Sequence, residues 1–158
     1  MVALWCSSCS EQDDTKAIRN VIDAAARCAE DHDVGGVLDL ALESVRADPG
    51  DLDRNGIKGI LWRAFQYYGP IKILYPRPDI EVIEGARQAI AVVPFLVVKK
   101  EQSYPKLEQL KDDPLAWLDE VGANADLYRL QMKWTGENGK WLVRHVLLER
   151  FTGLGFRE

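Results

Sequence analysis

The sequence has no long hydrophobic run and no excess of basic residues. Its longest apolar stretch, Ala89 to Val98, is about half the length that a helix needs to cross a bilayer, and it contains Pro94. There are 25 acidic and 20 basic side chains, which leave a formal charge of -5. A protein built mainly to bind nucleic acid should instead carry a basic surface. Membrane-spanning and nucleic-acid-binding proteins are therefore disfavoured.

Cysteine and histidine are also scarce, with three and two residues respectively. Cys6 and Cys9 have the spacing of a redox or zinc pair, but they precede every core element, and no second pair completes a metal site. Residues 30–33 hold one histidine among consecutive carboxylates, which do not converge on a single ion. Residues 153–155, Gly-Leu-Gly, precede no helix and so do not form a phosphate loop. We expect no metal and no cofactor.

Residues 1–12 are first apolar and then small and polar, and they lack the basic region of a signal peptide. The pattern fits a lipoprotein terminus in which Cys6 or Cys9 is lipidated and a serine-rich tether follows. Trp5, directly before Cys6, is bulkier than a lipidation site favours. The alternative is a frayed cytoplasmic terminus.

Three stripes of apolar residues at helical spacing predict three helices in succession. The first runs from Ile18 to Ala29 after a cap at Asp13 or Asp14. The second runs from Val34 to Val45. The third runs from Ile57 to Tyr68 and ends at Gly69-Pro70, because glycine and then proline commonly follow a helix end.

From residue 71 the apolar period changes to two, which is typical of strands. The expected strands are 71–75, 79–83, Gln88–Lys100, Asp126–Thr135 and Trp141–Phe151. Asn138-Gly139 between the last two is a strong signal for a two-residue turn. Pro94 predicts a bulge or an edge position, because proline cannot donate to the ladder.

The polar segment 101–124 interrupts the strands. One short helix is expected there after Asp113-Pro114, with Leu115, Trp117 and Leu118 on its apolar side. A long connection between neighbouring strands often acts as a lid or a contact element. We therefore treat this segment as an insertion in a single domain that spans residues 13–158.

Helices followed by long strands predict an α+β fold, with the helices on one face of an antiparallel sheet. Three stretches, Glu30–Leu38, Ile80–Ile90 and Glu137–His145, resemble the nuclear-transport-factor-2-like superfamily. The resemblance covers the chain from about Asp14 to Phe151. It implies a cone-shaped, cystatin-like fold with a strongly curved sheet and a pocket at the open end.

The same resemblance implies little about activity, since the superfamily includes isomerases, dehydratases, cyclases and protein-binding modules. Many of its small bacterial members are envelope proteins with a lipidated cysteine. This favours a periplasmic or membrane-anchored location, with a cytoplasmic one as the alternative. Members commonly pair their sheets into homodimers, and Leu142, Val146 and Leu148 suit such a contact.

A two-residue turn at Asn138-Gly139 also predicts the register of the last hairpin and which side chains share its inner face. The predicted inner pairs are Trp134–Val143, Met132–His145, Leu130–Leu147 and Tyr128–Glu149. A histidine beside a carboxylate in a dry pocket can act as a general base. His145, Glu149 and Tyr128 are thus the candidate catalytic residues, unless a different turn shifts the register.

The remaining pocket residues are expected from the third helix and the inner sheet face: Trp62, Tyr68, Phe95, Met132 and Trp134. Because no complete catalytic constellation is visible, the sequence predicts a non-enzymatic domain that binds a small apolar molecule or a partner protein. The alternative is a cofactor-free, dehydratase-like lyase or isomerase that uses His145 with Glu149 or Tyr128. Any membrane contact is expected only through the N-terminal lipid.

Overall fold

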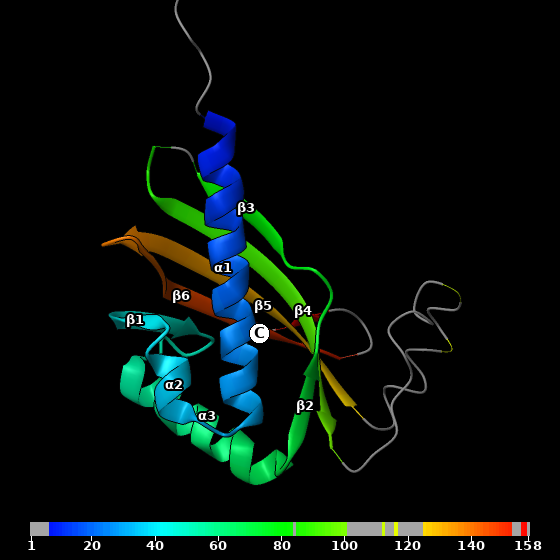
Figure 1. The fold of residues 1–158 in the computed structure, drawn as a ribbon. Coiled ribbons are helices and arrows are strands. Elements are labelled where there is room, and N and C mark those ends of the chain that lie inside the picture. The colour runs from blue at the N-terminus through cyan, green and yellow to red at the C-terminus, as the bar shows by residue number, and fades with distance from the viewer. Residues whose placement is uncertain are drawn as a thin grey trace, which may run out of the picture.

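One long helix, α1 (Ser7–Glu30), lies across a curved sheet, and α2 (Val34–Leu38) and α3 (Arg54–Tyr68) lie at one end of it (Figure 1). The computed structural model describes residues 7–83, 85–100, 112, 116, 125–152 and 156–157. Its strands are β1 (Ala41–Asp48), β2 (Ile71–Leu74), β3 (Asp79–Ile83), β4 (Gln88–Lys99), β5 (Ala125–Glu137), β6 (Lys140–Phe151) and β7 (Phe156–Arg157). The predicted α+β fold, with N-terminal helices packed on a curved sheet, is confirmed.

The sheet is mixed and not purely antiparallel. Its strand order is β1-β6-β5-β4-β2, with β3 also paired to β4 and β7 to β6. β1 runs parallel to β6, whereas the other pairs of described strands are antiparallel. The expectation of an antiparallel sheet is therefore wrong at the β1 edge, where the sequence had predicted a helix.

The second helix was predicted from Val34 to Val45, but it ends at Leu38. The later residues of that segment, from Ala41 onward, form β1. Gly36 is needed here because a Cβ at this position would come within 2.8 Å of the Cys28 sulfur. Short apolar runs fit a helix or a strand equally well, so pairing with β6 decides between them. Arg54 stabilises the change of direction by donating to the carbonyl oxygens of Leu38, Ala41 and Leu42.

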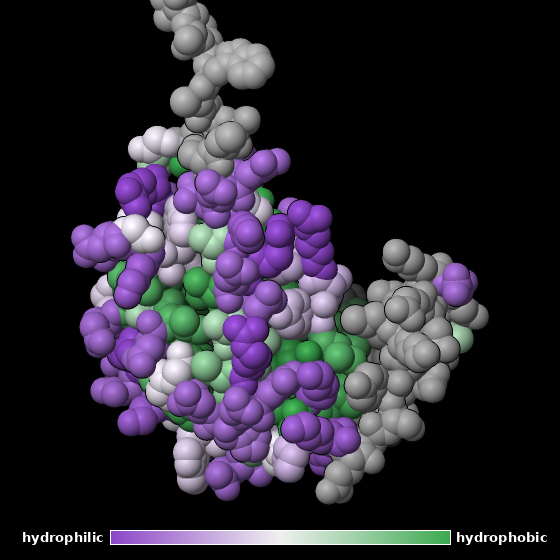
Figure 2. Space-filling view, in the orientation of Figure 1, coloured by the Kyte–Doolittle hydropathy of each residue, from purple (hydrophilic) through white to green (hydrophobic). Residues whose placement is uncertain are grey.

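The main core lies between α1 and the sheet. Ile18 and Ile22 of α1 form one cluster with buried side chains of β1, β4, β5 and β6, among them Val45, Ala91, Trp134 and Val143. Hydrophilic residues cover the outward side of α1, with hydrophobic residues gathered on either side of it (Figure 2). The helix is amphipathic, as its sequence predicted.

Side-chain hydrogen bonds fix α1 along its length. The Trp141 indole N–H donates to Asp14 at 3.0 Å, the Tyr75 hydroxyl donates to Asp23 at 2.5 Å, and the Ile73 amide donates to Glu30 at 2.9 Å. The helix begins at Ser7 and not at the predicted cap. Asp14 serves instead as an acceptor for the sheet, which its sequence context does not reveal.

The strand predictions are confirmed, including the Asn138-Gly139 turn, whose φ angles of 51° and 75° are those of a tight hairpin. Pro94 lies where the outer neighbour of β4 is interrupted. β3 pairs with β4 only as far as Val92, and β2 pairs with it only from Leu96 onward. Pro94 is thus locally at an edge, which was one of the two expected positions.

Some predictions fall on residues that the structure does not describe. Cys6 is one of them, and so are Asp113, Leu115, Trp117 and Leu118 of the expected helix. The lipidation, tether and docking predictions stay predictions, but Cys9 and residues 7–12 of the expected tether lie in α1. Cys28 is a free thiol that is partly buried.

Candidate functional site

The register of the β5–β6 hairpin follows the prediction only near the turn. The pairs from Glu137–Lys140 to Trp134–Val143 are as predicted, but the register then shifts, so that Lys133 lies opposite His145. Arg144 is the extra residue of this β-bulge, which moves every later side chain of β6 to the other face. The predicted pairs Met132–His145, Leu130–Leu147 and Tyr128–Glu149 are therefore wrong.

The bulge separates the candidate catalytic residues from one another. His145 lies opposite Lys133 and binds the Asp48 carboxylate through Nε2 at 2.9 Å. Glu149 lies opposite Arg129, which donates two hydrogen bonds to it at 2.7 and 2.9 Å. Those hydrogen bonds hold the pKa of Glu149 below its ordinary value. His145 and Glu149 thus belong to two separate pairs and are not joined to Tyr128.

The predicted pocket residues divide into three groups. Tyr68 and Phe95 meet Tyr128 in one apolar cluster, in which the rings of Phe95 and Tyr128 stack with centroids 5.5 Å apart. Met132 and Trp134 are buried in the main core against α1. Trp62 is 59% exposed on the outer side of α3, so its assignment to the pocket is wrong. The buried aromatic residue of α3 is instead Phe65, three residues after Trp62.

Tyr68, Asp126, Tyr128 and Arg150 form a hydrogen-bonded network, called here the Tyr68 network. The Tyr68 hydroxyl donates to Asp126 at 2.5 Å and lies 2.7 Å from the Tyr128 hydroxyl. Arg150 donates to the other oxygen of Asp126 at 2.7 Å. Because Tyr68 has a single proton and gives it to Asp126, Tyr128 is the donor in the second bond. The Tyr128 oxygen is left with lone pairs that can accept from a ligand.

An apolar cluster surrounds this network. Phe65 of α3, Ile71 of β2 and Val97 of β4 are buried, and Tyr68, Phe95 and Tyr128 pack against them. His32 covers the same cluster, with its ring stacked on Phe65 at 4.8 Å and its Nε2 bound to the Gly69 carbonyl at 2.8 Å. A carbonyl can only accept, so Nε2 carries the proton. His32 is thus a structural histidine in this arrangement.

The pKa values of Tyr68 and Asp126 are shifted away from neutrality. Partial burial raises the pKa of Tyr68 strongly, and the hydrogen bonds with Asp126 and Tyr128 add to the effect. Burial also disfavours the Asp126 carboxylate, but the hydrogen bonds from Tyr68 and Arg150 outweigh this and lower its pKa. A general acid or base works best with a pKa near the working pH. This network is therefore suited to binding and poorly suited to proton transfer.

Replacing Asp126 by asparagine tests these assignments through stability. The pKa of Asp126 is lower in the folded chain than in the unfolded one. Its carboxylate therefore stabilises the fold above the ordinary carboxyl pKa of about 3.9, and this contribution is lost as the pH falls through the folded value. At about pH 7, Asp126→Asn is expected to lower the free energy of unfolding by about 1–3 kcal/mol.

Urea unfolding at about pH 7 and about pH 3 measures this difference. The difference in the free energy of unfolding between the wild type and Asp126→Asn should be smaller at the lower pH, because the protonated Asp126 no longer stabilises the fold as the carboxylate does. Glu81→Gln on the exposed side of β3 is the control and should show no such change. A deficit that is equal at both pH values would contradict the assignment.

The sequence identified Tyr68, Phe95 and Tyr128 for this site but missed Asp126 and Arg150. The sequence marks Asp126 only as the start of a strand. Arg150 lies opposite Tyr128 only because of the bulge at Arg144, which no local pattern announces. The alternation of β5 was the available signal, because Asp126 and Tyr128 are two residues apart on one face.

Neither a metal centre nor a membrane span is found in the part of the chain that the structure describes. No three histidine, cysteine or acidic side chains gather there in a way that could hold an ion. None of the described helices combines the length and the apolar character needed to span a bilayer.

Comparison with known proteins shows the fold. No protein-family profile and no curated protein matches the chain. A nuclear-transport-factor-2-like protein with a cystatin-like fold from Novosphingobium aromaticivorans aligns with a TM-score of 0.64 at 12% identity, over 89% of this chain and 83% of that one. A protein of unknown function with a cystatin-like fold from Nostoc punctiforme aligns with a TM-score of 0.66 at 11% identity, over 87% and 91%.

An enzyme has the same architecture. A hexachlorocyclohexane dehydrochlorinase from Novosphingobium barchaimii aligns with a TM-score of 0.66 at 8% identity, over 96% of this chain and 93% of that one. At such low identity the likeness concerns the fold alone, which hosts both enzymes and proteins of unknown function.

Proposed function

We propose that this chain, which has the fold of nuclear-transport-factor-2-like proteins, binds a small apolar molecule that carries a hydroxyl group. The ligand packs on the apolar cluster of Phe95 and Val97 and donates a hydrogen bond to Tyr128. The observation that carries the proposal is the Tyr68 network, which its own hydrogen bonds hold against an apolar cluster and in which the pKa values of Tyr68 and Asp126 are shifted away from neutrality. Apolar walls with a few placed polar groups are typical of small-ligand sites.

The direction of the hydrogen bonds supports a ligand that donates. Arg150 and Tyr68 both donate to Asp126, and Tyr128 donates to Tyr68. The chain of donors therefore ends with the Tyr128 oxygen as a free acceptor position. An alcohol or a phenol satisfies it, whereas an ether of the same shape does not.

A matched pair of probes tests this proposal: 2-naphthol, which can donate, and 2-methoxynaphthalene, which cannot. One hydrogen bond contributes about 1 kcal/mol, so 2-naphthol is expected to bind roughly 3- to 10-fold more tightly. In Tyr128→Phe this preference should disappear. Fluorescence titration of both naphthalenes against each variant measures it.

Two controls make the result specific. Tyr67→Phe removes a hydroxyl from a side chain that is 74% exposed next to Tyr68 and should keep the preference. His145→Ala alters a residue outside the cluster and should also keep it. Equal affinities for the two naphthalenes in the wild-type chain would refute the assigned hydrogen bond.

The alternative function is that of a cofactor-free lyase or isomerase. It draws support from the dehydrochlorinase among the structural neighbours. It has less support from the site, because His145 is bound to Asp48 and lies apart from Tyr128. Loss of 2-naphthol binding on His145→Ala would favour this alternative over simple ligand binding.

The proposal also includes the cell envelope as the location, with a lipid on Cys6 or Cys9, and a homodimer through the sheet. The bulge turns Val146 toward the core, against which it packs partly buried, so only Leu142 of the three residues expected at a dimer contact keeps its predicted face. Mass spectrometry of the protein from its natural host, with and without Cys6→Ala and Cys9→Ala, tests the lipid. A monomeric sedimentation profile at high concentration would contradict the dimer.

A further inference from the structure

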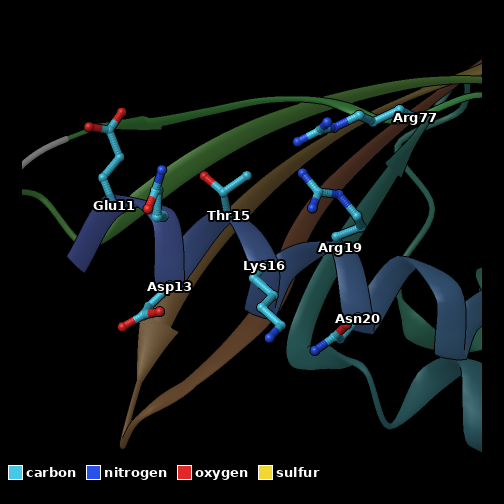
Figure 3. A pocket seen from close by; sticks show the side chains of 8 residues that line it. Glu11, Asp13, Thr15, Lys16, Arg19, Asn20 and Arg77 are labelled. Atoms are coloured by element: carbon cyan, nitrogen blue, oxygen red, sulfur yellow. The ribbon is translucent and has the colours of Figure 1, made fainter. Parts of the chain in front are cut away.

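A groove of about 700 Å³ lies between the first half of α1 and the connection from β2 to β3 (Figure 3). Thr15, Lys16 and Arg19 of α1 line one wall, and Arg77 of the connection lines the other. None of these residues belongs to the Tyr68 network. The groove is large enough for a small organic molecule, since ligand sites commonly measure about 300–1,000 Å³.

Two guanidinium groups reach into this groove. Arg19 and Arg77 come from opposite walls, and their side chains point toward the same space (Figure 3). Within the described ranges, no carboxylate is hydrogen-bonded or ion-paired to either of them, and Arg19 Nε is buried without an acceptor. Arginine stays protonated at all relevant pH values, so both groups carry a positive charge. Two unneutralised charges that face one space favour an anion between them.

The other polar and charged groups that line the groove are distributed along its length. The Thr15 side chain extends from the same side of α1 as Arg19, whereas the Lys16 side chain points away from Arg77 (Figure 3). Glu11 and Asp13 also line the groove, but their carboxylates lie toward the start of α1, away from the arginines (Figure 3). The groove therefore has a basic end and an acidic end.

We propose that the basic end of this groove binds a phosphate monoester, with Arg19 and Arg77 holding its phosphate group. Guanidinium groups match phosphate oxygens with paired hydrogen bonds. A phosphate monoester carries about -1.5 to -2 charges near pH 7 and so neutralises both arginines, whereas a carboxylate or a phosphodiester carries a single charge. The remaining length of the groove takes the organic part of the molecule.

Isothermal titration with phenyl phosphate, methyl phenyl phosphate and benzoate at low salt tests the proposal. Phenyl phosphate is expected to bind roughly tenfold or more tightly than either singly charged molecule. Arg77→Gln and Arg19→Gln should each remove this preference. Arg77 is exposed in a connection, so its variant keeps the fold even if Arg19→Gln is destabilised. Arg63→Gln on the exposed side of α3 is the matched control and should change nothing.

Binding of phenyl phosphate that is unchanged in Arg77→Gln would overturn the proposal, and so would equal affinities for phenyl phosphate and benzoate. Vesicles of phosphatidylcholine with phosphatidic acid distinguish the source of the monoester. Arginine-dependent binding of the vesicles alone assigns a lipid headgroup, and binding of phenyl phosphate assigns a soluble molecule. The 2-naphthol preference should survive in Arg77→Gln, because the two sites share no residue.

Discussion

Trp134→Ala is expected to lower the free energy of unfolding by about 3–5 kcal/mol. Trp134 is the largest fully buried side chain described, with 1% of its surface exposed. It lies in β5 between Ala89 of β4 and Val143 of β6, and it belongs to the core on which α1 packs. Alanine would leave a cavity between the helix and the sheet that neighbouring strands cannot fill by collapse.

This loss should come from packing alone, because the Trp134 indole N–H is buried without a hydrogen-bond partner. Trp134→Phe is therefore expected to retain more of the stability than the alanine variant does. Trp62→Ala is the matched control, since Trp62 is 59% exposed, and it should change stability by less than about 0.5 kcal/mol. Urea unfolding followed by circular dichroism measures all three variants. Equal losses for Trp134→Ala and Trp62→Ala would contradict the assigned core.

Phe65→Ala is expected to cost a similar amount, about 3–5 kcal/mol, and also to weaken ligand binding. Phe65 is buried, packs with Ile71 and Val97, and stacks on His32. Phe65 packs α3 against this cluster one turn before Tyr68. Its replacement by alanine should therefore loosen the C-terminal end of α3 and displace the Tyr68 hydroxyl. The preference for 2-naphthol over 2-methoxynaphthalene should fall with it.

Comparing Trp134→Ala with Phe65→Ala distinguishes an effect on the ligand site from a general loss of stability. Trp134 and Phe65 belong to different apolar clusters. Under conditions where each variant is folded, Trp134→Ala should keep the 2-naphthol preference and Phe65→Ala should lose it. Gln66→Ala on the exposed side of α3 should keep both stability and binding. A Phe65→Ala protein that binds like the wild type would show that α3 does not position the site.

The fold could be predicted from the sequence wherever the apolar residues kept one pattern of spacing over a long segment. The apolar stripe of α1, the continuous apolar run of β4 and the alternation of β5 each specify one structure, and the Asn138-Gly139 turn has the dihedral angles that its residues favour. The stretch from Val34 to Val45 fits two structures. Its outcome depends on pairing with β6, more than ninety positions further along, which no local pattern contains.

At the candidate site, too, the local sequence does not reveal the pairing of distant segments, and the error begins at a single residue, Arg144. The register predicted for β5 and β6 holds from the turn to Val143 and fails at Arg144. At that point β6 also binds the segment before β1, since the Val143 amide donates to the Leu40 carbonyl at 3.1 Å. This one-residue bulge removed His145 from the predicted site and brought Arg150 to Tyr128. The predicted inner face of β5 holds, with Met132 and Trp134 buried, because the extra residue lies in β6.

The central claim is that a ligand hydroxyl binds at Tyr128 within the Tyr68 network. Two-dimensional NMR of protein with labelled tyrosine rings, titrated with 2-naphthol, tests it directly. The ring signals of Tyr68 and Tyr128 should shift together and reach saturation, while that of Tyr67 stays in place. Signals of Tyr68 and Tyr128 that do not move while 2-naphthol binds, or that move no more than Tyr67, would contradict the account.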